Sequence, residues 1–326
     1  MRAPPPPYRH PSRRAFLAST LGLGAAAACA RLGGGAEWGL AGLGFPVLLT
    51  AADDALYVVD REPHVDTGSM ILRAPWSGGL ARPVALREPL IAALAVVDNE
   101  VLWACSRSDE LRAADRAGER RPRTVARHPG GFAALSVGRG ALYAAGAAGP
   151  LFALERGALR AVHPAPATAI AATDDGGVAF ASQGAVWHAP PGAPARRLAD
   201  APRLGALVAQ GRRAYFTVRA STRKGADGEL RAVTLDDGHV EALATAVFDP
   251  TALAVDADHL WYYGARVDIA RRVDDGCIGR ISLRDKARRD LPVAMTVTSL
   301  LARGGALYVA GLAAPPIGGV VRRRGG

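Results

Sequence analysis

Hydrophobic and polar residues alternate along this chain in a pattern that repeats seven times. In each repeat an apolar, β-rich stretch passes through a short polar turn into a hydrophobic residue followed by an aromatic one. The seven pairs are Leu56-Tyr57, Leu102-Trp103, Leu142-Tyr143, Ala179-Phe180, Ala214-Tyr215, Leu260-Trp261 and Leu307-Tyr308. The aromatic residue therefore recurs after 46, 40, 37, 35, 46 and 47 residues. Because such a period is typical of a four-stranded unit, the pattern predicts an all-β, seven-bladed β-propeller with four-stranded antiparallel blades.

The end of the chain supplies only three strands for the seventh repeat. An open sheet edge is prone to aggregation, so another segment is expected to cover it. The segment Glu37–Leu43 lies before the first inner strand and has no other assignment. We predict that it forms the outermost strand of the last blade and closes the ring. A distorted ring of six blades remains an alternative.

The first thirty residues have the character of an export signal. Arg13 and Arg14 precede an apolar run rich in Ala and Gly over residues 15–30, which resembles a twin-arginine signal peptide. The run is too short for a comfortable membrane span. Ala26–Cys29 is similar to a bacterial lipobox, in which Cys29 is lipidated, whereas cleavage after Ala30 gives a soluble protein. We expect an exported protein that is either periplasmic or membrane-anchored on the periplasmic or outer side.

The rest of the chain contains no linker that would divide it. We predict residues 1–30 as the export signal, 31–36 as a glycine-rich tether and 37–326 as a single propeller domain. The signal holds four arginines and no acidic residue, so its removal lowers the formal net charge from +10 to +6. Basic residues are not gathered on one surface with interleaved aromatic residues, and this argues against nucleic acid as a partner.

Two repeats carry a more specific pattern. Ala254-Val255-Asp256 followed by Leu260-Trp261-Tyr262 and Gly279–Leu283, together with Ile71–Gly79, resemble the YWTD-like propeller repeats of secreted bacterial proteins. In that family an Asp follows the aromatic strand, and it is recognisable here as Asp60. The resemblance implies the propeller architecture. Binding is the commoner role in such proteins, so the resemblance also favours binding over catalysis.

The loops between second and third strands differ in length, being long in repeats five, six, seven and one. Successive strands are antiparallel, so these loops are expected side by side on one face, where they form a crescent. Loops on a rigid scaffold often carry function, and we take the crescent as the candidate binding surface. Around the apolar segment Pro315–Ile317, its charged residues are Arg61, His64, Asp66, Arg219, Arg223, Lys224, Arg266, Asp268, Arg271, Arg272, Asp274 and Asp275.

The sequence shows no catalytic constellation. No two histidines after the signal lie at metal-ligand spacing, so His259 and the others are interpreted as surface or turn residues. The Asp-Asp pairs lack the alternating ligands of a calcium loop. We therefore predict no catalytic residue, metal or cofactor. Cys105 and Cys277 belong to distant repeats and are predicted to be unpaired thiols, because a disulfide requires Cα atoms within about 7 Å.

These patterns favour a cell-envelope scaffold that binds a protein, peptide or glycan partner without catalysis. The alternative is a propeller enzyme of the lactonase or lyase kind with a divalent cation in the central channel. Such an enzyme needs carboxylates, Asn or His converging from several inner strands. The predicted inner strands contain mostly Ala, Val, Leu, Ser and Thr. A quinone-dependent dehydrogenase would explain export in the folded state, but the regular Trp and Gly motifs of its repeats are weak here.

Overall fold

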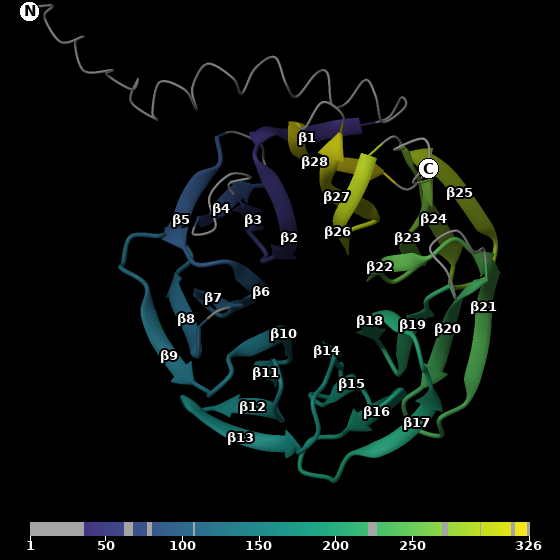
Figure 1. Ribbon diagram of the computed structural model, residues 1–326, viewed down its shortest axis with the longest axis horizontal. Helices are drawn as coiled ribbons and strands as arrows, with labels where there is room; N and C mark the ends of the chain where they lie inside the picture. Colours follow the sequence, from purple (N-terminus) through teal and green to yellow (C-terminus); the bar gives the residue numbers. More distant parts are fainter. Residues whose placement is uncertain are drawn as a thin grey trace, which may run out of the picture.

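The computed structural model describes residues 36–61, 68–76, 80–106, 108–220, 227–268, 273–293, 295–313 and 317–324. Within these ranges the strands form seven four-stranded antiparallel sheets. The sheets stand side by side around a ring, and one edge strand of each sheet lies nearest the centre (Figure 1). This arrangement is a β-propeller. No helix among the described residues is long and apolar enough to cross a membrane.

Blades are numbered here in chain order, with their strands running outward from the centre. Blades one to three are built from β2 (Phe45–Ala51), β3 (Ala55–Arg61), β4 (Ser69–Pro75) and β5 (Arg82–Glu88), then β6 (Ile91–Val97), β7 (Glu100–Cys105), β8 (Glu110–Asp115) and β9 (Arg123–Arg127), then β10 (Phe132–Gly138), β11 (Ala141–Gly146), β12 (Leu151–Glu155) and β13 (Ala158–His163). Blades four and five are built from β14 (Ala169–Ala172), β15 (Val178–Ser182), β16 (Ala185–Ala189) and β17 (Arg196–Asp200), then β18 (Leu204–Gln210), β19 (Arg213–Val218), β20 (Gly228–Thr234) and β21 (Val240–Val247). Blade six comprises β22 (Pro250–Val255), β23 (His259–Asp268), β24 (Val273–Ser282) and β25 (Arg288–Val293), and blade seven comprises β26 (Met295–Arg303), β27 (Ala306–Ala313), β28 (Ile317–Arg324) and β1 (Ala36–Leu43).

The last blade contains both ends of the described chain. Its outermost strand, β1, pairs antiparallel with β28, and the register sets Leu40 opposite Val320 and Leu43 opposite Gly318. The segment Glu37–Leu43 therefore occupies the place predicted from the sequence. This pairing satisfies backbone groups of β28 that would otherwise form an open edge. Asp60 in β3 then fixes the turn into blade one, because its carboxylate accepts backbone N–H bonds from Gly44 and Phe45 at 3.0 and 2.7 Å.

The hydrophobic core is divided among the contacts between neighbouring blades. All seven hydrophobic-aromatic pairs lie in the second strands, as their position after the polar turn predicts. Tyr57 of blade one and Trp103 of blade two are fully buried in one cluster, and Leu56 and Tyr308 belong to the cluster between blades one and seven. Alanine fills many of the remaining core positions, which allows neighbouring sheets to approach closely.

The long loops predicted for blades six and seven are an error of the sequence analysis. In repeat six the sequence predicts a long loop over residues 266–276, but β23 and β24 continue their ladder until Asp268 lies opposite Val273. Likewise β27 and β28 extend to Ala313 opposite Ile317. An antiparallel ladder satisfies backbone N–H and C=O groups wherever the two strands stay in register. Polar side chains on such an extension resemble a loop when only the sequence is considered.

Candidate functional site

The predicted crescent is only partly within the described residues. Arg61 and Arg219 have described side chains. Arg266, Asp268, Asp274 and Asp275 lie in the hairpin of β23 and β24, of which only the backbone is described there. The crescent residues outside the described ranges are His64, Asp66, Arg223, Lys224, Arg271, Arg272, Pro315 and Pro316, and the signal residues Arg13, Arg14 and Cys29 lie outside them too.

Arg61 and Arg219 lie at the ends of the second strands of blades one and five, and each binds to the start of the next blade. Arg61 donates from Nη2 to the carbonyl oxygen of Ile91, the first residue of β6, at 2.9 Å. Arg219 donates from Nε and Nη2 to the carboxylate of Asp249, directly before β22, at 2.9 and 2.6 Å. These hydrogen bonds raise the pKa of Arg219 against the effect of burial. Both guanidinium groups thus hold neighbouring blades together, and the crescent as a binding surface stays a prediction.

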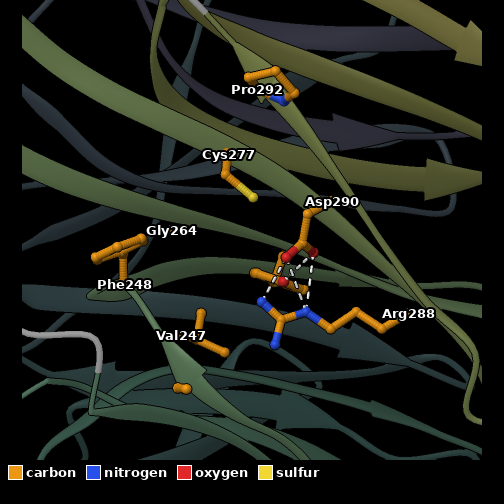
Figure 2. A pocket seen from close by; sticks show the side chains of 9 residues that line it. Val247, Phe248, Gly264, Cys277, Arg288, Asp290 and Pro292 are labelled. Carbon is orange, nitrogen blue, oxygen red and sulfur yellow. Dashed lines mark hydrogen bonds and ion pairs between the residues drawn. The ribbon is translucent and has the colours of Figure 1, made fainter.

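A pocket of about 280 Å³ opens between blades five and six. One of its lining residues, Phe248, directly precedes Asp249 in the chain. Figure 2 shows the side chains that surround it. Blade five contributes the end of its outermost strand and blade six contributes its three outer strands. The lining residues are Ala246, Val247, Phe248, Tyr262, Gly264, Cys277, Arg288, Asp290 and Pro292.

The backbone of blade five shapes one wall of the pocket. Ala246 has a φ of 55°, and the pairing of β21 with β20 is irregular near this end. A residue in the left-handed region redirects the strand, so Phe248 leaves the sheet and remains 37 % exposed. Gly264 makes the close approach possible, because a Cβ atom there would lie 2.5 Å from the carbonyl oxygen of Phe248.

The polar side of the pocket is a cluster centred on Asp290. The Tyr262 hydroxyl donates to Asp290 Oδ1 at 2.5 Å, and Arg288 donates from Nε and Nη2 to Oδ2 at 3.0 and 2.6 Å. The guanidinium carbon of Arg288 also lies 5.6 Å from the centre of the Tyr262 ring. Burial raises the pKa of Asp290, but the hydrogen bonds from Arg288 and Tyr262 outweigh this effect and lower it. Asp290 is therefore ionised at neutral pH and balanced by Arg288.

The phenol and the thiol of the pocket are both held in their neutral forms. Burial, together with the hydrogen bond to Asp290, raises the pKa of Tyr262. Burial and the nearby Asp290 charge raise the pKa of Cys277 to about 11. A thiol with a raised pKa is a weak nucleophile at neutral pH. Cys105 and Cys277 are both free, so the prediction of two unpaired thiols is confirmed.

Sequence reasoning missed this pocket. Two features of the sixth repeat were visible in the sequence, namely Gly264 directly after Tyr262-Tyr263, and Gly279 in the predicted third strand. The structural role of these two glycines depends on contacts across the sheet and with the neighbouring blade. A Cβ atom at Gly279 would overlap the Tyr262 ring, so the glycine allows that ring to lie across the sheet toward Asp290.

Comparison with known proteins supports the fold and leaves the activity open. No protein-family model matches the sequence, and no curated protein matches it. Solved propellers are similar in structure, among them the WD40 β-propeller domain of Doa1, with 12 % identity, 88 % of this chain and 96 % of that chain covered, and a TM-score of 0.64. A catalytically inactive virginiamycin B lyase from Staphylococcus aureus, solved with quinupristin, shows 11 % identity, coverage of 85 % and 94 %, and a TM-score of 0.62. The β-propeller domain of the Trilobed protease from Pyrococcus furiosus shows 7 % identity, coverage of 87 % and 97 %, and a TM-score of 0.64. Proteins this different share the architecture alone.

Proposed function

We propose that this protein is an exported cell-envelope scaffold that binds a protein or peptide partner through an apolar side chain inserted between blades five and six. The observation that carries the proposal is the pocket beside Phe248, a residue that is 37 % exposed although the aromatic residues of the seven hydrophobic-aromatic pairs are buried. Exposed aromatic residues beside a pocket are typical anchors of protein interfaces.

The chemistry of the pocket favours an apolar occupant. Its volume of about 280 Å³ lies just below the range of small-molecule sites and suits one or two side chains. Val247, Phe248 and Pro292 offer hydrocarbon surface. The charges of Asp290 and Arg288 are paired with each other, so neither requires an opposite charge on the ligand.

The same residues argue against the enzyme alternative. The Cys277 thiol has a raised pKa, and the Asp290 carboxylate is held by Arg288 and Tyr262. The described inner strands β2, β6, β10, β14, β18, β22 and β26 contain no Asp, Glu or His. A cation in the central channel would lack ligands from these strands, which is why binding is proposed in place of a lactonase or lyase activity.

Export and attachment complete the proposal. The pair Arg13-Arg14 would direct the protein out of the cytoplasm, and lipidation of Cys29 would anchor it to a membrane. The glycine-rich segment before β1, which contains three consecutive glycines, would then serve as the tether.

The test compares an exposed apolar residue at the pocket with an exposed apolar residue on the outer edge of another blade. Phe248→Asp places a charge at the pocket, whereas Leu86→Asp changes a side chain that is 56 % exposed on the outermost strand of blade one. Crosslinking in producing cells followed by mass spectrometry should detect one partner, reduced at least about tenfold by Phe248→Asp and unchanged by Leu86→Asp. Equal recovery with both variants would remove the pocket from the proposal. A stoichiometric metal or quinone in the purified protein, together with turnover of a small molecule, would favour the enzyme alternative.

A further inference from the structure

A separate cluster of polar side chains lies at the opposite end of β22, in the turn that joins it to β23. Asp256, Asp258 and His259 each offer one ligand atom there, and the three atoms lie within 4.8 Å of one another. Within the described part of the chain, these three side chains form a group that is compact enough to bind one metal ion together. It contains no residue of the pocket, which lies beside the other end of β22.

The turn holds the three side chains close together. Asp256 Oδ1 accepts the backbone N–H groups of Asp258 and His259 at 3.0 and 2.9 Å, and the Asp256 N–H donates to the carbonyl oxygen of His259 at 3.0 Å. His259 Nδ1 lies 3.7 Å from the same carboxylate oxygen. These bonds are those of an ordinary Asp-initiated turn, and they explain the backbone without any ion.

The second oxygen of Asp256 is what the turn leaves unexplained. The Asp256 side chain is only 9 % exposed, and its Oδ2 is buried without a hydrogen-bond partner. Oδ2 shares a carbon atom with Oδ1 and therefore borders the same group of ligand atoms. A buried carboxylate oxygen without a partner is unfavourable, costing about 1–3 kcal/mol or more. A cation bound to this carboxylate would remove that cost.

We propose that Asp256, Asp258 and His259 bind one divalent transition-metal ion of the zinc class. An imidazole nitrogen combined with carboxylate oxygens suits Zn²⁺ and Co²⁺, whereas Mg²⁺ and Ca²⁺ prefer oxygen ligands alone. Three protein ligands leave at least one position for water or for a donor atom from another molecule. The site would clamp the inner end of blade six, and it goes beyond the binding function proposed above.

A third carboxylate adds negative charge beside the cluster. Asp285 lies in the turn between β24 and β25, where its Oδ1 accepts the Ala287 N–H at 3.1 Å and its own N–H donates to Ser282 Oγ at 3.4 Å. The Asp285 carboxylate lies close enough to interact electrostatically with His259, and it strengthens the attraction of this end of blade six for a cation.

The chain offers a matched control in the neighbouring blade. His239 follows Asp237 in a turn of blade five, and its backbone N–H donates to Asp237 Oδ1 at 2.9 Å. This turn has the same aspartate-to-backbone bond and a nearby histidine, but the pair is not part of a group of three ligand atoms. His239→Ala should therefore leave metal binding unchanged.

The experiment uses the protein without a histidine tag, stripped of metal by a chelator. Titration with Zn²⁺ by calorimetry and with Co²⁺ by visible absorption should show one ion per chain. His259→Ala should weaken both at least about tenfold, Asp258→Asn should weaken them as well, and His239→Ala should not. Circular dichroism of each metal-free variant checks the fold, and the exposed Asp258 carries the test if His259→Ala does not fold. Absence of saturable binding, or equal affinity in the folded His259 or Asp258 variant and the parent protein, would overturn the site.

Discussion

The contact between blades one and two and the contact between blades five and six use the same strand positions, yet only the second forms the pocket. Glu88 at the end of β5 and Val247 at the end of β21 occupy corresponding places in their sheets. Each follows a residue with a positive φ, which is 59° at Arg87 and 55° at Ala246. The backbones are therefore alike, and the difference comes from the side chains.

At the first contact a carboxylate reaches across to the next blade. Glu88 is buried, accepts a hydrogen bond from Trp103 Nε1 at 3.0 Å, and forms an ion pair with Arg112. The guanidinium carbon of Arg112 lies 5.9 Å from the centre of the Trp103 ring. The aromatic residue of blade two thus points its polar atom at blade one, and the space between the blades is filled.

At the second contact the polar partner of the aromatic residue lies in its own sheet. Tyr262 corresponds in register to Trp103, but the residue beside it on the third strand is Gly279, where blade two has Arg112. The Tyr262 ring lies across that glycine, and its hydroxyl donates a hydrogen bond to Asp290 on the outermost strand. Val247 offers no acceptor to draw it toward blade five. The comparison teaches that the direction of one hydrogen bond decides whether a blade contact is filled or hollow.

Removing the carboxylate at the filled contact should have the largest effect. Glu88→Ala leaves Trp103 Nε1 and the Arg112 guanidinium without their partner, so we expect the free energy of unfolding to fall by about 3 kcal/mol. Val247→Ala at the corresponding position removes only hydrocarbon and should cost about 1–2 kcal/mol. Denaturant unfolding of both variants measures this difference. Equal losses would mean that the two contacts are not distinguished by the carboxylate.

Closing the hollow contact should have the next largest effect. Gly264→Ala brings a Cβ atom to 2.5 Å from the Phe248 carbonyl oxygen, so the end of blade five must shift. We expect a loss of about 2 kcal/mol in denaturant unfolding. Partner recovery in the crosslinking experiment should fall in parallel. Unchanged stability would show that the two blades are not in contact there as described.

Removing one hydroxyl should affect stability less. Tyr262→Phe deletes the bond to Asp290 but leaves Asp290 paired with Arg288, so we expect a loss of about 1 kcal/mol. Chemical denaturation at neutral pH provides the measurement. A loss as large as that of Glu88→Ala would contradict the view that the Asp290 cluster is supported by two independent partners.

Acid should weaken the hollow contact through Asp290. Its pKa is lowered in the folded protein, so the stabilisation is present above the unfolded value of about 4 and is lost as the pH falls through the folded pKa. The parent protein should therefore lose more stability than Asp290→Asn when the pH is lowered from about 6 to about 3. Thermal unfolding followed over this range tests the prediction, and identical slopes would refute it.

The thiols provide the smallest and most local test. The pKa of each is raised to about 11, so both should react about a hundredfold more slowly than free cysteine at neutral pH. Cys105 is completely buried at the filled contact, whereas Cys277 is partly exposed at the pocket. A small uncharged thiol reagent followed by mass spectrometry should therefore label Cys277 before Cys105. The reverse order would contradict an open pocket.

What the sequence determined by itself was the local pattern of the ring. The aromatic residues after each polar turn predicted the second strands, because a strand buried between two sheets needs apolar residues on both faces. The segment Glu37–Leu43 was placed correctly, since an incomplete last repeat requires one more strand. The unpaired thiols followed from the distance between their repeats.

Only the tertiary structure decided which contact between blades contains a pocket and which side chains are in contact. The pocket depends on Tyr262 turning toward Asp290 and on Gly264 facing the Phe248 carbonyl of another blade. The orphaned oxygen of Asp256 became visible only when burial was known. Residue order determines which groups repeat. Contacts across blades and sheets depend on register and side-chain direction, which a linear pattern does not contain.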